Sequence, residues 1–396
     1  MAIGTPFHPR TEPLCHSYDW TQWSGYLSVS SYNDFVQPEY ASIRNSAALI
    51  DLSPLYKYAV HGADAASLVD RIVTHDAEAM SAGQVVYTPW CDPNGMVRQE
   101  GTVFRFEEDR FEIYAAEPAF EWIQRNAVGY QVEVTDRSAE VAMLSLQGPH
   151  SRAVLDAATD GAIGDLKFFR CIRARVGGVD VVVSRTGFTG DLGYEIWIPA
   201  EEALPVWDHL MEVGVPWQIT PCGLVAMDIA RVEAGLILIS VDYVSSEFAH
   251  TEDDLVTPYE LGLGWAVKLD RGNFVGRKAL RAANEEGPPR CVVGLEIEWQ
   301  PLEEAYMAAD LMPELTMTVC REPVPVYSDE GRQVGRATSK VWSKLLKKYI
   351  ALATVEADCA KLGSRVEMEI TVQYQRRRVA ATVVDNHFFR PPRMRA

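Results

Sequence analysis

The chain has 396 residues, of which 47% are hydrophobic and 23% are charged, and its formal net charge is −18. This length favours more than one folded unit, and the composition is typical of a globular protein and excludes a disordered one. Because so negative a field repels a polyphosphate backbone, nucleic acid is not an expected partner.

The apolar runs and the cysteines indicate the compartment. The longest apolar runs, such as residues 236–239, are far too short to span a membrane, and residues 1–10 show no export signal. The seven cysteines are scattered and never spaced C-x-x-C, which argues against a disulfide framework and for a reducing compartment. We therefore expect a cytoplasmic protein. The sequence shows no metal-ligand spacing and no dinucleotide-binding turn, so we expect neither a metal nor nicotinamide.

The pattern of apolar residues predicts short strands and helices that follow one another along the chain. Residues 1–40 are aromatic and irregular. Alternating and apolar runs predict strands over residues 56–61, 85–87, 102–106, 110–114, 141–146, 179–184 and 194–198. Helical patterns are found over residues 39–48, 63–73, 120–125, 204–213 and 225–233.

The stretch over residues 281–290 is polar, contains Pro and Gly, and has no periodicity. We place a domain boundary there, with one domain over residues 1–284 and another over residues 285–396. Beyond the boundary, short strands separated by turns predict a small antiparallel barrel.

Several segments, in order across nearly the whole chain, resemble the glycine cleavage T-protein (aminomethyltransferase) family. They are Arg44–Asp51 (RNSAALID), Leu146–Pro149 (LQGP), Arg185–Ile196 (RTGFTGDLGYEI), Arg231–Gly235 (RVEAG), Thr257–Asp270 (TPYELGLGWAVKLD), GRKAL at 276–280, and residues 383–392. The resemblance implies an α+β fold with three domains around a central folate channel, the last domain being an antiparallel β-barrel. It also implies tetrahydrofolate as the cofactor of a one-carbon transferase.

The resemblance assigns roles to particular residues. Glu195 follows a glycine-rich turn and corresponds to the glutamate that grips the pterin ring in the family; a carboxylate suits this role because it accepts two parallel hydrogen bonds. Tyr87, Phe188 and Trp265 are candidates for lining the folate channel, although large aromatic residues also pack in cores. Arg231 could hold a carboxylate of substrate or cofactor, or could tie its helix to an acidic loop.

The chain departs from the family pattern where the family has its catalytic aspartate. By register Gln99 takes that place, and an amide cannot act as a general base. A slip of one residue would put Glu100 there instead and preserve a carboxylate. Other departures are Pro54 and Leu55 in place of His and Met, Met227 in place of an arginine, and Phe188 in place of a tyrosine.

These departures favour a demethylase, which moves a methyl group from a small S-, N- or O-methylated substrate to tetrahydrofolate and needs less acid–base machinery. An aromatic box for an onium cation could come from Trp20, Trp23, Tyr26 and Tyr32, or these residues could be ordinary packing. The alternatives are an aminomethyltransferase that forms 5,10-methylenetetrahydrofolate through Glu100, and a non-catalytic folate-binding paralogue. A homo-oligomer is compatible with the sequence.

Overall fold

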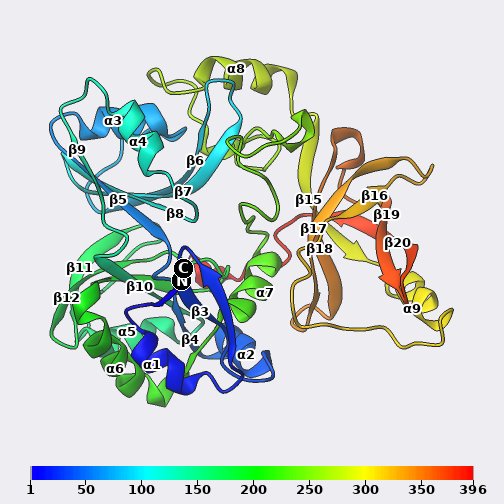
Figure 1. The fold of residues 1–396 in the computed structure, drawn as a ribbon, viewed down its shortest axis with the longest axis horizontal. Helices are drawn as coiled ribbons and strands as arrows, with labels where there is room; N and C mark the ends of the chain where they lie inside the picture. Colours follow the sequence, from blue (N-terminus) through cyan, green and yellow to red (C-terminus); the bar gives the residue numbers. More distant parts are fainter. Residues whose placement is uncertain (1, 396) are drawn as a thin grey trace.

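The structure is a computed structural model that describes residues 2–395. Figure 1 shows two sheet-containing bodies, one above the other in this view, and a barrel to their right. The upper body holds a sheet with the order β6-β7-β8-β5-β9. Its strands are β5 (Tyr56–His61), β6 (Gln84–Cys91), β7 (Val97–Glu107), β8 (Arg110–Ala115) and β9 (Glu133–Asp136), and its helices are α3 (Ala65–Ile72) and α4 (Phe120–Asn126).

The lower body holds a sheet with the order β11-β12-β13-β10-β4-β14. Its strands are β4 (Ala47–Asp51), β10 (Val141–Gln147), β11 (Cys171–Val176), β12 (Val179–Ser184), β13 (Gly193–Pro199) and β14 (Ile219–Pro221). Its helices are α2 (Gln37–Asn45), α5 (Ser151–Ala158), α6 (Ala203–Val213) and α7 (Leu224–Ala234). A core that includes Leu144, Val154, Ile196 and Trp207 packs α5 and α6 against this sheet.

The barrel closes with the antiparallel order β15-β18-β17-β16-β19-β20. Its strands are β15 (Arg290–Ile297), β16 (Val324–Tyr327), β17 (Gln333–Ser343), β18 (Lys348–Glu356), β19 (Arg365–Val372) and β20 (Gln375–Val384), with α9 (Trp299–Met307) beside them. The expected α+β architecture with a C-terminal antiparallel barrel is confirmed. The domain boundary at 284/285 stays a prediction; it falls within α8 (Arg277–Glu286), a few residues before β15.

Two expectations about the N-terminal region are wrong. The part of residues 1–40 that the structure describes is not irregular: β1 (Ile3–Gly4), β2 (Asp19–Trp23) and β3 (Tyr26–Ser31) form a small sheet with α1 (His8–Thr11) nearby. The helix expected to reach residue 48 ends at Asn45, because Ala47–Asp51 pairs with β10 as strand β4. Tertiary pairing overrides the helical pattern there.

Among the described residues no helix is long and apolar enough to cross a membrane.

Candidate functional site

A cavity of about 680 Å³ lies where the two bodies, α7 and the tail segment (residues 385–395) come together. This volume is within the range of small-molecule sites. Its polar lining includes Tyr87 and Glu100 from the upper sheet and Glu195 from the lower sheet.

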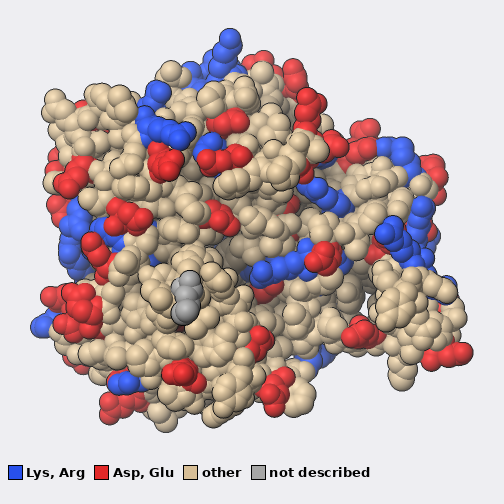
Figure 2. Space-filling view, in the orientation of Figure 1, with Lys and Arg blue, Asp and Glu red and all other residues tan. Residues whose placement is uncertain are grey.

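Lys and Arg are interspersed with Asp and Glu over the face shown in Figure 2, so the net charge does not make this face uniformly acidic.

Glu195 lies on β13, buried, with its cross-strand neighbour Ser184 on β12. Thr186 Oγ1 donates a hydrogen bond of 2.5 Å to Glu195 Oε2. Burial raises the pKa of the Glu195 carboxyl to about 7, and the Thr186 hydrogen bond opposes this rise. No arginine or lysine within the described residues forms an ion pair with Glu195 under 4.0 Å, so the carboxylate keeps acceptor sites for a ligand.

The glycine-rich bend (residues 187–193) comes before Glu195 and lines the cavity. The buried Gln147 side chain lies between Gly187 and Gly193, and a Cβ at either glycine would overlap it. Gly190 has a φ of +67° and lies against Ala234 of α7, where a Cβ would also clash. Glycine is therefore required here for close packing as well as for backbone conformation.

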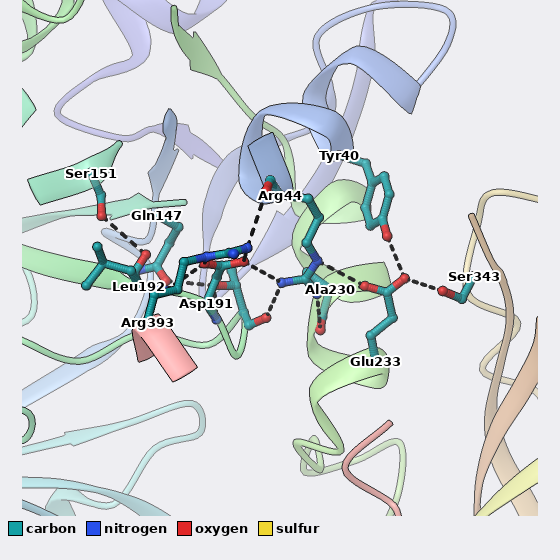
Figure 3. A network of polar contacts seen from close by, with 11 residues as sticks. Tyr40, Arg44, Gln147, Ser151, Asp191, Leu192, Ala230, Glu233, Ser343 and Arg393 are labelled. Atoms are coloured by element: carbon teal, nitrogen blue, oxygen red, sulfur yellow. Dashed lines mark hydrogen bonds and ion pairs between the residues drawn. The ribbon is translucent and has the colours of Figure 1, made fainter. Parts of the chain in front are cut away.

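A buried polar network fixes the bend to the rest of the molecule (Figure 3). Arg393 of the tail segment donates two hydrogen bonds, of 2.6 and 2.8 Å, to Asp191 of the bend. Arg44 of α2 lies between Asp191 and Glu233 of α7, and its Nη2 is 2.7 Å from Glu233 Oε2. Ser343 of the barrel donates a 2.6 Å hydrogen bond to the same glutamate. The network thus joins the lower body, the barrel and the tail segment.

Glu100 is the second buried carboxyl that lines the cavity. Tyr243 Oη lies 3.3 Å from Glu100 Oε1. Burial raises the pKa of Glu100 to about 7, against hydrogen bonds from Tyr87 and Tyr243 that lower it. Gln99 is not among the lining residues; its Oε1 accepts a hydrogen bond from the Glu117 backbone N–H. Of the two neighbours considered from the sequence, the structure therefore brings Glu100 to the cavity.

The three aromatic candidates all line the cavity. The rings of Tyr87 and Trp265 lie 6.4 Å apart at an angle of 26°, and Phe188 belongs to the bend. Trp265 is 58% exposed, which places it at the mouth of the cavity. A flat ligand could pack against these rings.

Part of the wall is apolar. Leu55 and Met227, which stand where the family has other residues, both line the cavity and pack in one hydrophobic cluster with Leu52 and Met143. Trp23 joins the same cluster. This part of the wall offers no charged group for a polar substrate.

The other sequence-predicted residues lie elsewhere. Arg231 does not line the cavity: it is fully buried and pairs with Asp228 at 2.8 Å and Asp242 at 2.5 Å. Its alternative role, tying its helix to an acidic loop, is the one the contacts support. Of the proposed aromatic box only Trp23 lines the cavity.

The remaining box residues lie away from the cavity, within the N-terminal region. The ring of Trp20 lies 5.1 Å from that of His8, and Tyr32 packs with Cys15. Tyr26 is half-buried on β3. Alternate residues of a strand face opposite sides, so Trp20 and Trp23 point to different surroundings.

Sequence reasoning did not identify several lining residues. Thr186 falls within a family-like segment, so its proximity to Glu195 could have been inferred from strand register. His75 lines the cavity, and burial lowers the pKa of its imidazole. Asn386, His387, Phe389 and Arg390 also fall within a family-like segment, residues 383–392. Other lining residues lie far apart in sequence and outside those segments: Tyr114, Phe168, Phe169, Trp197 and Arg395. No cluster of His, Cys, Asp or Glu among residues 2–395 is arranged to hold a metal ion.

Comparisons with known proteins cover most of the chain. Residues 14–271 match the GCVT N-terminal domain, and residues 311–390 match the glycine cleavage T-protein C-terminal barrel domain. The aminomethyltransferase of Caldanaerobacter subterraneus subsp. tengcongensis is 32% identical over 357 residues, which are 89% of this chain and 87% of that protein. The aminomethyltransferase of Halalkalibacterium halodurans is 32% identical over 377 residues, covering 94% and 93%. In fold, the glycine cleavage system aminomethyltransferase T from Bartonella henselae superposes with a TM-score of 0.82 at 24% identity, covering 98% of this chain and 99% of that chain.

Proposed function

Because this chain belongs to the glycine cleavage T-protein family, we propose that it transfers an aminomethyl carbon to tetrahydrofolate and forms 5,10-methylenetetrahydrofolate. The observation that carries this proposal is the carboxyl of Glu100, which lines the cavity in place of the amide of Gln99. The curated relatives named above are aminomethyltransferases. The demethylase interpretation therefore takes second place.

The residues present fit tetrahydrofolate. Glu195 is a buried carboxyl with no cationic partner among residues 2–395, and it can accept both N–H groups of the pterin edge. The bend lines the cavity next to Glu195, and a Cβ at Gly187 or Gly193 would overlap the end of the buried Gln147 side chain. Tyr87 and Trp265 would pack against the aromatic spacer, with the anionic tail leaving past the exposed Trp265.

Glu100 would supply the proton chemistry. An amino group that leaves the transferred carbon must gain a proton, and a carboxyl with a pKa of about 7 is half protonated near neutral pH. Such a group can donate that proton and recover it afterwards, which is the condition for efficient general acid catalysis. The hydroxyls of Tyr87 and Tyr243 hold this carboxyl in place.

A second candidate is methyl transfer from a small methylated substrate. Leu55 and Met227 make part of the wall apolar, which suits a small hydrophobic donor whose methyl group is aligned with the acceptor in a dry pocket.

One experiment separates these functions. Purified protein is incubated anaerobically with tetrahydrofolate and either aminomethyl or methyl donors, and the folate products are separated and quantified. Aminomethyl transfer yields 5,10-methylenetetrahydrofolate, whereas demethylation yields 5-methyltetrahydrofolate. Tight folate binding without either product, for every donor, would instead indicate a non-catalytic folate-binding protein and would overturn the proposal.

A further inference from the structure

Four buried polar side chains share one face of the strand pair β12–β13 and its extension. Ser184 and Glu195 are cross-strand partners, so their side chains lie on the same face. Thr186 lies two residues after Ser184, and Trp197 lies two residues after Glu195, which puts both on that face as well. Each of the four is less than 9% exposed.

Hydrogen bonds connect these side chains in a line. Trp197 Nε1 lies 3.4 Å from Ser184 Oγ, and Ser184 Oγ lies 2.7 Å from Thr186 Oγ1. Thr186 Oγ1 then lies 2.5 Å from Glu195 Oε2. The line runs from an indole in the cavity wall to the carboxyl that faces the cavity.

Elementary donor counting gives the line a direction. An indole N–H can only donate, so Ser184 Oγ accepts from Trp197. An ionised carboxylate can only accept, so Thr186 donates its single hydroxyl proton to Glu195. Ser184 must then donate to Thr186. In this arrangement every proton has one acceptor, and the order is Trp197 to Ser184 to Thr186 to Glu195.

We propose that Trp197, Ser184 and Thr186 form a donor relay that positions Glu195 and favours its ionised form, so that the carboxylate is ready to accept both N–H groups of a pterin edge. This inference rests on the proposed function. Thr186 occupies one acceptor site of Oε2 and so fixes the carboxylate plane, while Oε1 and the second acceptor site of Oε2 stay available to the two N–H groups. The three relay residues act through Glu195 and are positioning residues.

The charges around Glu195 are consistent with this role for the relay. Burial raises the pKa of Glu195 to about 7 and the Thr186 hydrogen bond lowers it. Asp191 of the bend is neutralised by Arg44 and Arg393. The other ionisable side chains that line the cavity are His75, Tyr87, Glu100 and Tyr114 from the upper body and His387, Arg390 and Arg395 from the tail segment. Burial and the Thr186 hydrogen bond, and not these groups, shift the pKa of Glu195.

The test compares tetrahydrofolate binding under anaerobic conditions at two pH values. Thr186→Val keeps the side-chain shape and removes the hydroxyl, so the pKa of Glu195 should rise by about one unit. Since one unit is a tenfold change in the protonation equilibrium, binding should weaken about fivefold near pH 7 and recover to within about twofold near pH 9. Thr186→Ser retains the donor and should bind like the wild type. Ser184→Ala should give a smaller loss in the same direction.

Thr159→Val is the matched control, because Thr159 is as buried as Thr186 but donates to a helix carbonyl away from the cavity. It should leave the pH profile unchanged. If Thr186→Val weakens binding equally at both pH values, the hydroxyl has only a packing role and the relay is refuted.

A ligand-free measurement distinguishes failure of the relay from failure of the proposed function. The infrared carboxyl band of Glu195, identified by its loss in Glu195→Gln, is titrated in the wild type and in Thr186→Val. A higher midpoint in Thr186→Val supports the relay even if no folate binds, in which case only the proposed function fails. An unchanged midpoint overturns the relay and leaves the proposed function standing.

Discussion

Two regions of this molecule contain buried carboxyl side chains with different hydrogen-bond partners. At the junction between α7 and the barrel, Glu233 accepts hydrogen bonds from Tyr40, Arg44 and Ser343. In the cavity, Glu195 and Glu100 have hydroxyl donors but no arginine or lysine partner among the described residues.

This difference in hydrogen-bond partners distinguishes carboxylates that hold the fold together from carboxylates that can bind a ligand. Asp242, also at the junction, is satisfied by Arg231, Thr338 and Ser339, so it has little capacity left for a ligand. Glu195 and Glu100 have fewer hydrogen-bond donors than a buried carboxylate can accept, and burial raises the pKa of each to about 7. Raised pKa values of this kind are typical of functional sites.

The largest effect should come from breaking the junction. Arg231→Met leaves Asp242 buried without its cation and leaves Asp228 with only the half-exposed Arg321, which should lower the free energy of unfolding by about 3–5 kcal/mol. Chemical denaturation measures this loss. Arg321→Ala serves as the control, because Arg321 pairs with the same Asp228 but is half exposed; its loss should stay below about 1 kcal/mol. If both variants lost the same free energy of unfolding, burial of the arginine would not determine the loss.

The next largest effect concerns the pterin contact. Glu195→Ala removes two charge-assisted hydrogen bonds, so tetrahydrofolate affinity should fall about 100-fold or more while the fold stays intact. Calorimetry gives the affinity and circular dichroism checks the fold. Glu201→Ala removes an exposed glutamate and should bind normally. Unchanged affinity in Glu195→Ala would refute the pterin assignment.

Neighbouring substitutions on β7 test the reacting carboxyl. Glu100→Gln removes the ionisable group and should lower kcat for aminomethyl transfer about 100-fold, with a small change in folate affinity. Gln99→Ala is the matched control and should change kcat less than about threefold, since Gln99 does not line the cavity. If Gln99→Ala lowered kcat more than Glu100→Gln did, Gln99 and not Glu100 would be the catalytic residue.

The smallest effect is a gain in stability. A glutamate whose pKa rises from about 4.3 in the unfolded chain to about 7 in the fold binds its proton more tightly when folded, so stability falls as pH rises between these values. The whole shift corresponds to about 3.7 kcal/mol, and relaxation around the buried charge reduces this value, so near pH 8 Glu195→Gln should be more stable than the wild type by about 1–2 kcal/mol. Near pH 4 the gain should vanish. Thermal unfolding at both pH values measures it, and a gain that is independent of pH would contradict the assigned ionisation.

Family-like segments allowed the barrel, the glycine-rich bend and Glu195 to be predicted, because these features are local in sequence. The choice between Gln99 and Glu100 could not be made, since the strand pairing of β6 and β7 shifts register between Trp90 and Cys91. Such an irregularity re-aims side chains and leaves no clear sequence signal. The role of Arg231 depends on Asp242, which approaches only once the loop after α7 has folded back.

The lining of the cavity extends from Trp23 to Arg395, and its wall includes a segment held by Arg393 against a bend some 200 residues earlier in the chain. During translation a growing polypeptide therefore cannot assemble the pocket until residue 395 has left the ribosome. Proteolytic trimming that reaches Arg393 would reopen one wall while leaving all of the sheets in place.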